Sequence, residues 1–336
     1  MPTTMYGDLT PRSAGAIARK LLDVAQPNLI TEPYLMVKPI PGNSGQSIIH
    51  RRYLSFPVST VPLSEGTPPA GIVPTFEDIT IGIQEFGGLV EISNRIEELH
   101  EDDIPAVTKQ RMAEQIAETF DTLRIGTLKG GSTVYYANGS ARTDVNTPVN
   151  TSKLHLIKRY LKAQKAKFYM GLLKAGQGFN TEPSAPCFVA LGHTDLEWDI
   201  RNLSGFVPYE QYSDSGAARP GEVGKVGSFR FCLSEQFSPW ADGGANKGDS
   251  GTNMLSTTGV KADVYPVIIL SPDAVCTTPL RGAGAITPFY VSPLKVSHSN
   301  KLGQRGHAGW RGWYGGGVLM QTHMVRFEVA ATETPS

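Results

Sequence analysis

The sequence has few cysteines, no net charge and no long run of apolar residues. No stretch approaches the roughly 18 consecutive apolar residues of a membrane-spanning helix. Residues Met1–Lys20 also lack the apolar core of a signal peptide. The sequence therefore predicts a protein that makes no membrane contact and that is not exported by a signal peptide.

Cysteine and charge narrow the possibilities further. The three cysteines are Cys187, Cys232 and Cys276, so any disulfide scheme leaves one thiol unpaired, and we expect three reduced thiols. Lys plus Arg equals Asp plus Glu at 31 each, which removes the broad positive field of a dedicated nucleic-acid-binding protein. Any contact with DNA should be local and weak.

Motifs for catalysis and for cofactor binding are also missing. The seven histidines form no His-x-x-x-His pair and have no Cys-x-x-Cys companion. His193 and Asp195 are residue types of a catalytic triad, but no nucleophile elbow accompanies them. The acidic residues at 101–103 are better explained as an acidic turn before a helix. We expect no enzyme activity, no metal and no cofactor.

Glycine and proline are plentiful, at 36 and 24 residues, and 40% of the chain is apolar. This composition predicts a folded α+β protein with many turns and short strands. Thr10-Pro11 predicts a helix start, and Pro33, Pro39 and Pro41 hold the following chain extended, which is typical of an N-terminal arm.

A long hairpin is predicted next. Gln46–Val58 and Thr75–Glu85 have strand patterns, and the segment Ser59–Pro74 between them is rich in proline and glycine. Its alternating pattern can bury only one face, so the hairpin should need a partner outside its own chain.

Two helices stand out. The longest covers 105–129, with Met112, Ile116, Phe120, Leu123 and Leu128 on one side and a stop at Gly130-Gly131. A second helix over 154–168, with Ser152 as its cap, has a basic surface that includes Lys158, Arg159, Lys162 and Lys165. This surface is solvated, contacts an acidic neighbouring subunit, or faces DNA.

Shorter elements follow. Asn138-Gly139 predicts a hairpin, and Thr194 starts a capping box before a helix. Further strands are expected at 187–191, 225–233, 263–270, 286–291 and 318–330, and 238–259 should be a mobile surface loop.

Six stretches resemble the major capsid proteins of podophages that package a virion RNA polymerase, and of related tailed phages. They are Tyr6–Arg12, Pro62–Pro68, Tyr135–Gly139, Gly192–Asn202, Pro208–Tyr212 and Asp263–Val267. The resemblance runs over nearly the whole chain. It implies the tailed-phage major capsid fold, which encapsulins and the herpesvirus capsid floor share.

That fold implies an N-terminal arm, an extended β-hairpin loop, a peripheral domain with a long spine helix, and an axial domain. The expected limits are 1–34 for the arm, 35–85 for the extended loop, 86–170 for the peripheral domain with spine helix 105–129, 171–291 for the axial domain, and 292–336 for the return to the peripheral domain.

The resemblance also implies a function. A capsid protein would assemble as pentamers and hexamers into an icosahedral head around double-stranded DNA, in the cytoplasm of the bacterial host. Portal, scaffolding and decoration proteins are expected partners. Candidate contacts with a neighbouring subunit on the extended loop are Arg51, Arg52, Leu63, Glu65, Pro68, Glu77 and Asp78. An encapsulin-like nanocompartment shell and a soluble β-rich ligand-binding protein are the alternatives.

Overall fold

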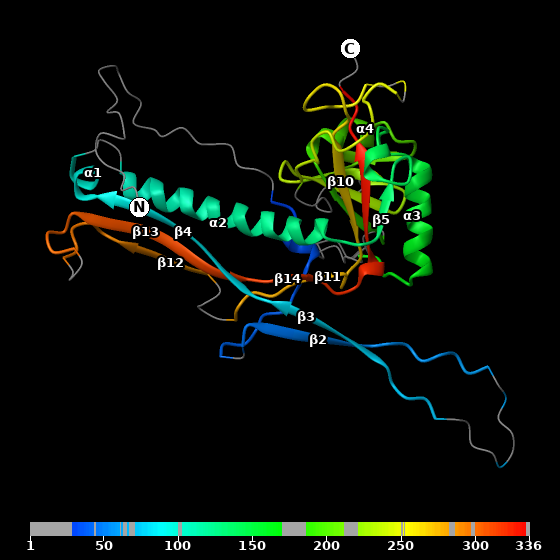
Figure 1. Ribbon diagram of the computed structural model, residues 1–336, viewed down its shortest axis with the longest axis horizontal. Coiled ribbons are helices and arrows are strands. Elements are labelled where there is room, and N and C mark those ends of the chain that lie inside the picture. Colours follow the sequence, from blue (N-terminus) through cyan, green and yellow to red (C-terminus); the bar gives the residue numbers. More distant parts are fainter. Residues whose placement is uncertain are drawn as a thin grey trace, which may run out of the picture.

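The computed structural model describes residues 29–43, 45–60, 62, 66, 71–99, 103–169, 186–211, 221–249, 251, 253–281, 286–296 and 300–333. Three parts are visible in Figure 1: a globular part built on a seven-stranded sheet, a long part in which a helix lies along a three-stranded sheet, and a hairpin that reaches away from both. The predicted α+β class is confirmed. The helix expected near Thr10 and the loop residues Leu63, Glu65 and Pro68 lie outside the described residues.

The long helix is α2, Ile104–Lys129, which agrees with the predicted 105–129 to within one residue. The Asp103 side chain accepts a hydrogen bond from the backbone N–H of Ala106 at 3.1 Å and caps the helix start. Met112, Phe120 and Leu128 are buried, as the apolar spacing predicted. A short helix, α1 (Asn94–Leu99), precedes it.

The three-stranded sheet beside α2 has the order β12 (Ile286–Val291), β13 (Arg305–Tyr314), β4 (Gln84–Ser93), with both pairs antiparallel. Its central strand β13 was not predicted, because its glycines are uncommon in strands. Packing explains them: a Cβ on Gly309 would lie 2.6 Å from Cε2 of Phe289 on β12.

The hairpin consists of β2 (Ser47–Tyr53) and β3 (Phe76–Gly82), paired antiparallel. The second predicted strand continues past β3 into β4, interrupted at Ile83, whose N–H donates to the carbonyl of Gln46 at 2.8 Å. Ile81 and Ile83 are buried while Thr80, Gly82 and Gln84 are exposed, so the predicted alternation is confirmed here.

The globular part contains a mixed sheet in which β15–β5 and β6–β9 pair parallel and the other neighbours pair antiparallel. Its strand order is β5 (Val134–Tyr136), β15 (Met324–Ala330), β10 (Val264–Leu270), β6 (Phe188–Gly192), β9 (Phe229–Leu233), β8 (Glu222–Val226), β7 (Phe206–Pro208).

Two helices and a small sheet complete this end of the molecule. Helix α3 (Thr151–Ala163) buries Leu154, Ile157 and Leu161 in the core of the globular part, and α4 (Glu197–Arg201) buries Ile200 there. The small sheet has the order β1 (Met36–Val37), β11 (Val275–Thr277), β14 (Gly316–Val318).

The segment Ile30–Leu35 joins the long part to the globular part. Ile30 and Leu35 share one apolar cluster with Ile125 of α2 and Val189 of β6. Burial of such side chains stabilises by roughly 1.5–3 kcal/mol each. The first described residues therefore form part of the joint between the two parts.

The basic helix ends earlier than predicted and begins with a different cap. Asn150, and not Ser152, caps α3, because its side chain accepts from the N–H of Ser152 at 2.9 Å. At the other end the N–H of Ala166 donates to Leu161 O at 2.9 Å, and Lys165 has φ 59°. The N–H of Lys165 also donates to Lys162 O at 3.0 Å, and the two bonds form a Schellman motif, so Lys165 lies beyond the helix.

Several shorter predictions are wrong. Asn138-Gly139 makes a turn but no hairpin, because β5 pairs parallel with β15 and the Asn138 amide instead donates to Asp144 O at 2.8 Å. The predicted strand 225–233 is the hairpin β8–β9, which turns at Gly227 with φ 57°.

His193, and not Thr194, caps the turn before α4, since its Nδ1 accepts from the N–H of Asp195 at 3.0 Å. The predicted strand 318–330 is divided between β14 and β15.

The loop 238–259 is irregular, but it packs against the core. Met254 is fully buried, and Trp240 exchanges backbone hydrogen bonds with Val264. The sheets also group residues differently from the expected domain limits: β5 and α3 belong to the globular part, and β12 belongs to the long part. The domain limits remain predictions.

Candidate assembly surfaces

The charges of the hairpin pair with each other. Arg51 lies opposite Asp78 and Arg52 lies opposite Glu77 across the two strands. Arg51 binds Asp78 through two hydrogen bonds of 2.8 Å, and Arg52 binds Glu77. The hydrogen bond from Arg51 lowers the pKa of the Asp78 carboxyl. These four side chains stiffen the hairpin, and their contact with a neighbouring subunit remains a prediction.

Beyond the paired charges, the hairpin carries exposed apolar side chains. Tyr53 and Phe76 pack edge to face at a centroid distance of 6.2 Å, and the Arg51 guanidinium lies 4.0 Å from the Phe76 ring centroid. Exposed apolar residues follow along both sides: Tyr53, Leu54, Phe56, Val58, Ile72, Val73 and Phe76. Val58 and Val73 are more than 80% exposed. So many exposed apolar residues on one arm indicate an interaction surface.

The long part has an apolar trough along α2. One hollow, of about 390 Å³, lies between α2 and β12–β13, and its lining includes Met112, Phe289 and Trp310. A second, of about 410 Å³, is lined by residues that include Phe120 and Trp313. Ala113 and Ile116 line both hollows, so the two lie side by side along α2, and we call the pair the α2 trough.

The basic surface of α3 has no acidic partner among the described residues. Lys158, Arg159 and Lys162 take part in no ion pair there, and Lys162 lies 3.6 Å from the ring centroid of Phe168. Lys165 and Lys167 add exposed charges just after the helix. The structure thus brings the predicted cations together, although Lys165 does so from a turn.

A family model described as "Phage capsid protein" matches residues 77–326, which is well over half of the chain. The chain belongs to this family of phage capsid proteins. No protein in the curated set of sequences matches it.

Solved structures match this capsid protein over nearly its whole length. The capsid of cyanophage P-SCSP1u has a TM-score of 0.61 at 17% identity and covers 95% of this chain and 93% of its own. The head of Helicobacter pylori bacteriophage KHP40 has a TM-score of 0.64 at 12% identity, covering 96% and 95%. The capsid of Ralstonia phage GP4 has a TM-score of 0.63 at 10% identity, covering 100% of both chains. At these identities the likeness shows the fold, which is the phage capsid fold.

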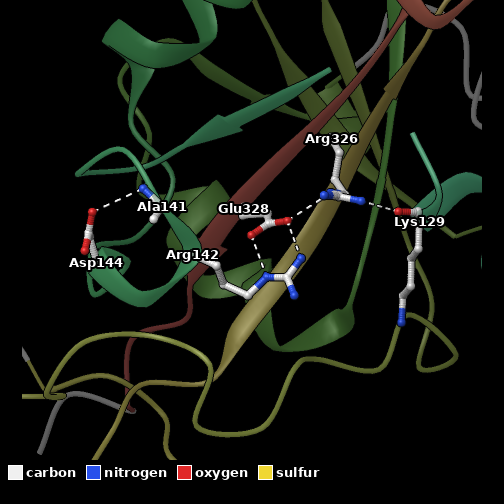
Figure 2. Close-up of polar contacts among 6 residues, drawn as sticks. All are labelled: Lys129, Ala141, Arg142, Asp144, Arg326 and Glu328. Atoms are coloured by element: carbon white, nitrogen blue, oxygen red, sulfur yellow. Dashed lines mark hydrogen bonds and ion pairs between the residues drawn. The ribbon is translucent and has the colours of Figure 1, made fainter. Parts of the chain in front are cut away.

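A charged cluster that sequence reasoning missed lies at the end of α2 in the capsid protein (Figure 2). Glu328 of β15 is fully buried and accepts two hydrogen bonds of 2.8 Å from Arg142. Arg326 lies 2.9 Å from Glu328 and donates to the backbone carbonyl of Lys129, the last residue of α2. The Arg142 guanidinium lies 3.7 Å from the ring centroid of Trp240.

This cluster connects α2 to the globular sheet. The ammonium of Lys129 donates to Ser238 O at 2.7 Å, and burial lowers its pKa. In the turn that contains Arg142, the Asp144 carboxyl accepts hydrogen bonds from the N–H groups of Ser140 and Ala141. These bonds lower the pKa of that carboxyl. The one sequence signal was that Arg326 and Glu328 are two residues apart in a strand and so share a face.

The residues considered for catalysis have structural partners in the capsid protein. Asp195 accepts from the Tyr265 hydroxyl at 2.7 Å as well as lying 3.2 Å from His193 Nδ1. Among the described residues, no group of three or more His, Cys, Asp or Glu side chains is arranged to hold a metal ion. None of the described helices is long and apolar enough to cross a membrane.

Proposed function

We propose that this protein is the major capsid protein of a tailed phage, assembling as pentamers and hexamers into an icosahedral head around double-stranded DNA. The hairpin carries this proposal. In a chain of the phage capsid family, its exposed apolar side chains lie far from the chain's own core and need a second copy to cover them.

The hairpin acts as a clasp over a neighbouring subunit. Its paired charges keep β2 and β3 stiff, so little conformational entropy is lost when the tip binds. The neighbour offers the apolar α2 trough as a receptor of suitable chemistry. Leu63, Glu65 and Pro68 lie in the tip segment and are candidate contacts. Many such weak contacts, made together, give a stable shell whose single interfaces can still be corrected.

Further partners follow from this role. The unpaired cations of α3 make weak, non-specific contacts with packaged DNA. Portal, scaffolding and decoration proteins bind the assembled head, which forms in the host cytoplasm. The protein has no catalytic role and needs no cofactor. Its relation to the podophages with a virion RNA polymerase remains a prediction from the resemblance.

Deletion of the hairpin tip tests the clasp. We expect a chain with residues 59–74 replaced by a short Gly-Ser turn to fold and yet to form no shells, because β2, β3 and the core of the other parts remain. Circular dichroism reports folding, and sedimentation with electron microscopy reports assembly. Shells of normal size from the deleted chain would refute the clasp.

A large side chain in the α2 trough tests the receptor. Ala113 is exposed and lines both hollows, so Ala113→Trp should fill the trough and reduce shell yield while the subunit stays folded. Glu118→Trp is the matched control, since Glu118 is on the same helix and lines neither hollow. Equal shell yields from both variants would exclude the trough as the receptor. The clasp itself would then be tested by the tip deletion alone.

Two alternatives predict other results. An encapsulin-like shell would assemble with a cellular cargo protein inside and no portal, so purified particles would contain that cargo in place of DNA. A soluble β-rich ligand-binding protein would stay monomeric at high concentration, even with a scaffold supplied. The family match and the exposed hairpin favour the phage head.

A further inference from the structure

A buried aspartate holds the first described segment of the chain. Asp121 of α2 is fully buried, and it accepts a hydrogen bond from the hydroxyl of Thr31. Thr31 is itself fully buried and precedes the turn Glu32–Tyr34. The second oxygen of Asp121, Oδ2, is buried and has no hydrogen-bond partner. The N-terminal segment is thus fastened to α2 at one carboxyl group.

The last described segment is held in the same way. Asp199 of α4 accepts from the backbone N–H of Thr332 at 2.8 Å and from its hydroxyl at 2.6 Å. Asp199 is about 9% exposed, so it too lies in the protein interior. At opposite ends of the described chain, α2 and α4 therefore each hold a terminal segment through a buried aspartate that binds a threonine.

Few charges act on either carboxyl group. Around Asp121 lie Arg124 of α2, at 4.0 Å, Glu32 of the N-terminal segment, and Tyr314 of β13. Glu32 offsets part of the effect of Arg124, with which it forms a 3.6 Å ion pair.

Next to Asp199 in the sequence, Arg201 pairs with Glu197, and Glu333, which follows Thr332, pairs with Lys247. Asp121 thus has one cation within 4.0 Å, Arg124, which it shares with Glu32, and Asp199 takes part in no ion pair among the described residues.

We propose that Asp121 and Asp199 are proton-dependent fasteners, which hold the N-terminal and C-terminal segments most firmly when they are protonated. An ionised carboxylate away from water is unfavourable unless it is closely paired with a cation, and neutral hydrogen-bond donors compensate only in part. A protonated carboxyl group still accepts from the threonine and avoids the charge. In the ionised form, the charge on Asp121 would extend to Oδ2, which is buried and has no hydrogen-bond partner.

The sign of the pH dependence follows from the pKa shifts. Burial raises the pKa of both carboxyl groups above the ordinary aspartate value. A segment that detaches returns its aspartate to water and to an ordinary pKa. The attached state therefore binds more protons, so attachment is strongest at low pH and weakens as the pH rises through the raised pKa.

These fasteners would add a property that the proposed shell function does not include. Each segment could be either attached to the subunit or detached from it. Thr31 lies in the joint between the long and globular parts, next to buried Ile30. Loosening at Asp121 would free the chain before it while leaving the apolar contacts of Leu35 in place. Copies in different positions of a shell could then hold this segment differently without refolding.

Hydrogen exchange of the full-length, unassembled subunit tests the proposal. Backbone protection of residues 29–34 and 331–333, corrected for intrinsic rates, is measured from about pH 4, near the ordinary aspartate pKa, to pH 8. We expect protection of both segments to fall severalfold as the pH rises, while the core strand β10 stays unchanged. Constant protection of both segments, or protection that rises with pH, would overturn the proposal.

Single variants provide the controls. In Asp121→Asn, which keeps an acceptor but cannot ionise, the N-terminal segment should lose its pH dependence while the C-terminal segment keeps it. Asp199→Asn should give the reverse. Thr31→Ser retains the hydroxyl donor and should behave as the parent protein. If Asp121→Asn removed the pH dependence of both segments, the cause would be a global change in stability, and the local fasteners would be rejected.

Discussion

At the scale of single residues, Lys165 has a backbone conformation that few lysines adopt. Its φ of 59° lies in the left-handed region, where a Cβ is unfavourable by roughly 1–2 kcal/mol. The chain tolerates this because the turn places Ala166 in the core beside Leu161, and both side chains are buried. The termination of the basic helix therefore depends on a strained residue that the apolar contacts hold in place.

Replacing this lysine by glycine should stabilise the subunit. We expect Lys165→Gly to raise the free energy of unfolding by about 0.5–1 kcal/mol, since glycine adopts positive φ freely but loses more backbone entropy on folding. Lys162→Gly, three residues earlier in the regular helix, should lower it by about 1 kcal/mol. Urea unfolding of the unassembled subunit measures both. If the Lys165→Gly protein were less stable than the parent, the left-handed conformation of Lys165 would not be a source of strain.

At the scale of elements, the junction of α2 with the globular sheet depends on Glu328. This carboxylate has no exposed surface, and Arg142 and Arg326 surround it. Arg326 in turn donates a hydrogen bond to the backbone carbonyl of Lys129 at the end of α2. This carbonyl has no partner within the helix. The position of the long helix relative to the sheet is thus fixed by one ion-pair cluster as well as by apolar packing.

Neutralising Glu328 should destabilise the subunit strongly. Glu328→Gln keeps the shape but leaves two guanidinium groups without a counter-charge, and we expect a loss on the order of 3 kcal/mol in the free energy of unfolding. Glu85→Gln is the matched control, because Glu85 pairs with exposed Arg311 at 3.9 Å and should change stability by less than about 1 kcal/mol. Similar losses in thermal unfolding of the two variants would contradict the importance of the buried cluster.

At the scale of the whole molecule, the charge is balanced but unevenly distributed. The sequence has as many acidic as basic side chains, yet residues 151–169 contain no acidic residue and several exposed cations. Balanced overall charge limits the attraction between subunit and DNA, while a local basic face still allows weak contact. This combination suits a phage head, because the DNA must be packaged into the head and later released from it.

Removing these charges should affect filled heads in particular. The triple variant Lys158→Gln, Lys162→Gln, Lys165→Gln should assemble empty shells normally and lower the ratio of DNA-filled to empty particles in density gradients. Replacing the same three lysines by arginine keeps the charge and should leave the ratio unchanged. If the glutamine variant instead failed to form shells of any kind, the basic face would belong to a contact between subunits.

The sequence by itself determined the elements whose signals are local. The spacing from Met112 to Leu128 and the pair Gly130-Gly131 defined α2, and strand alternation with a Pro- and Gly-rich tip defined the hairpin. The family resemblance was also available, because its short stretches do not depend on contacts between distant residues.

Only the tertiary structure decided which segments meet. Strand β13 was hidden because its glycines are explained by neighbours on β12, and Asn138-Gly139 makes no hairpin because β15, almost 190 residues later, pairs with β5. The Arg142–Glu328 cluster and the Asp121–Thr31 contact join residues 186 and 90 positions apart. A sequence shows which side chains can pair or bury, but burial and pairing between distant segments are settled only when the whole chain packs into one core.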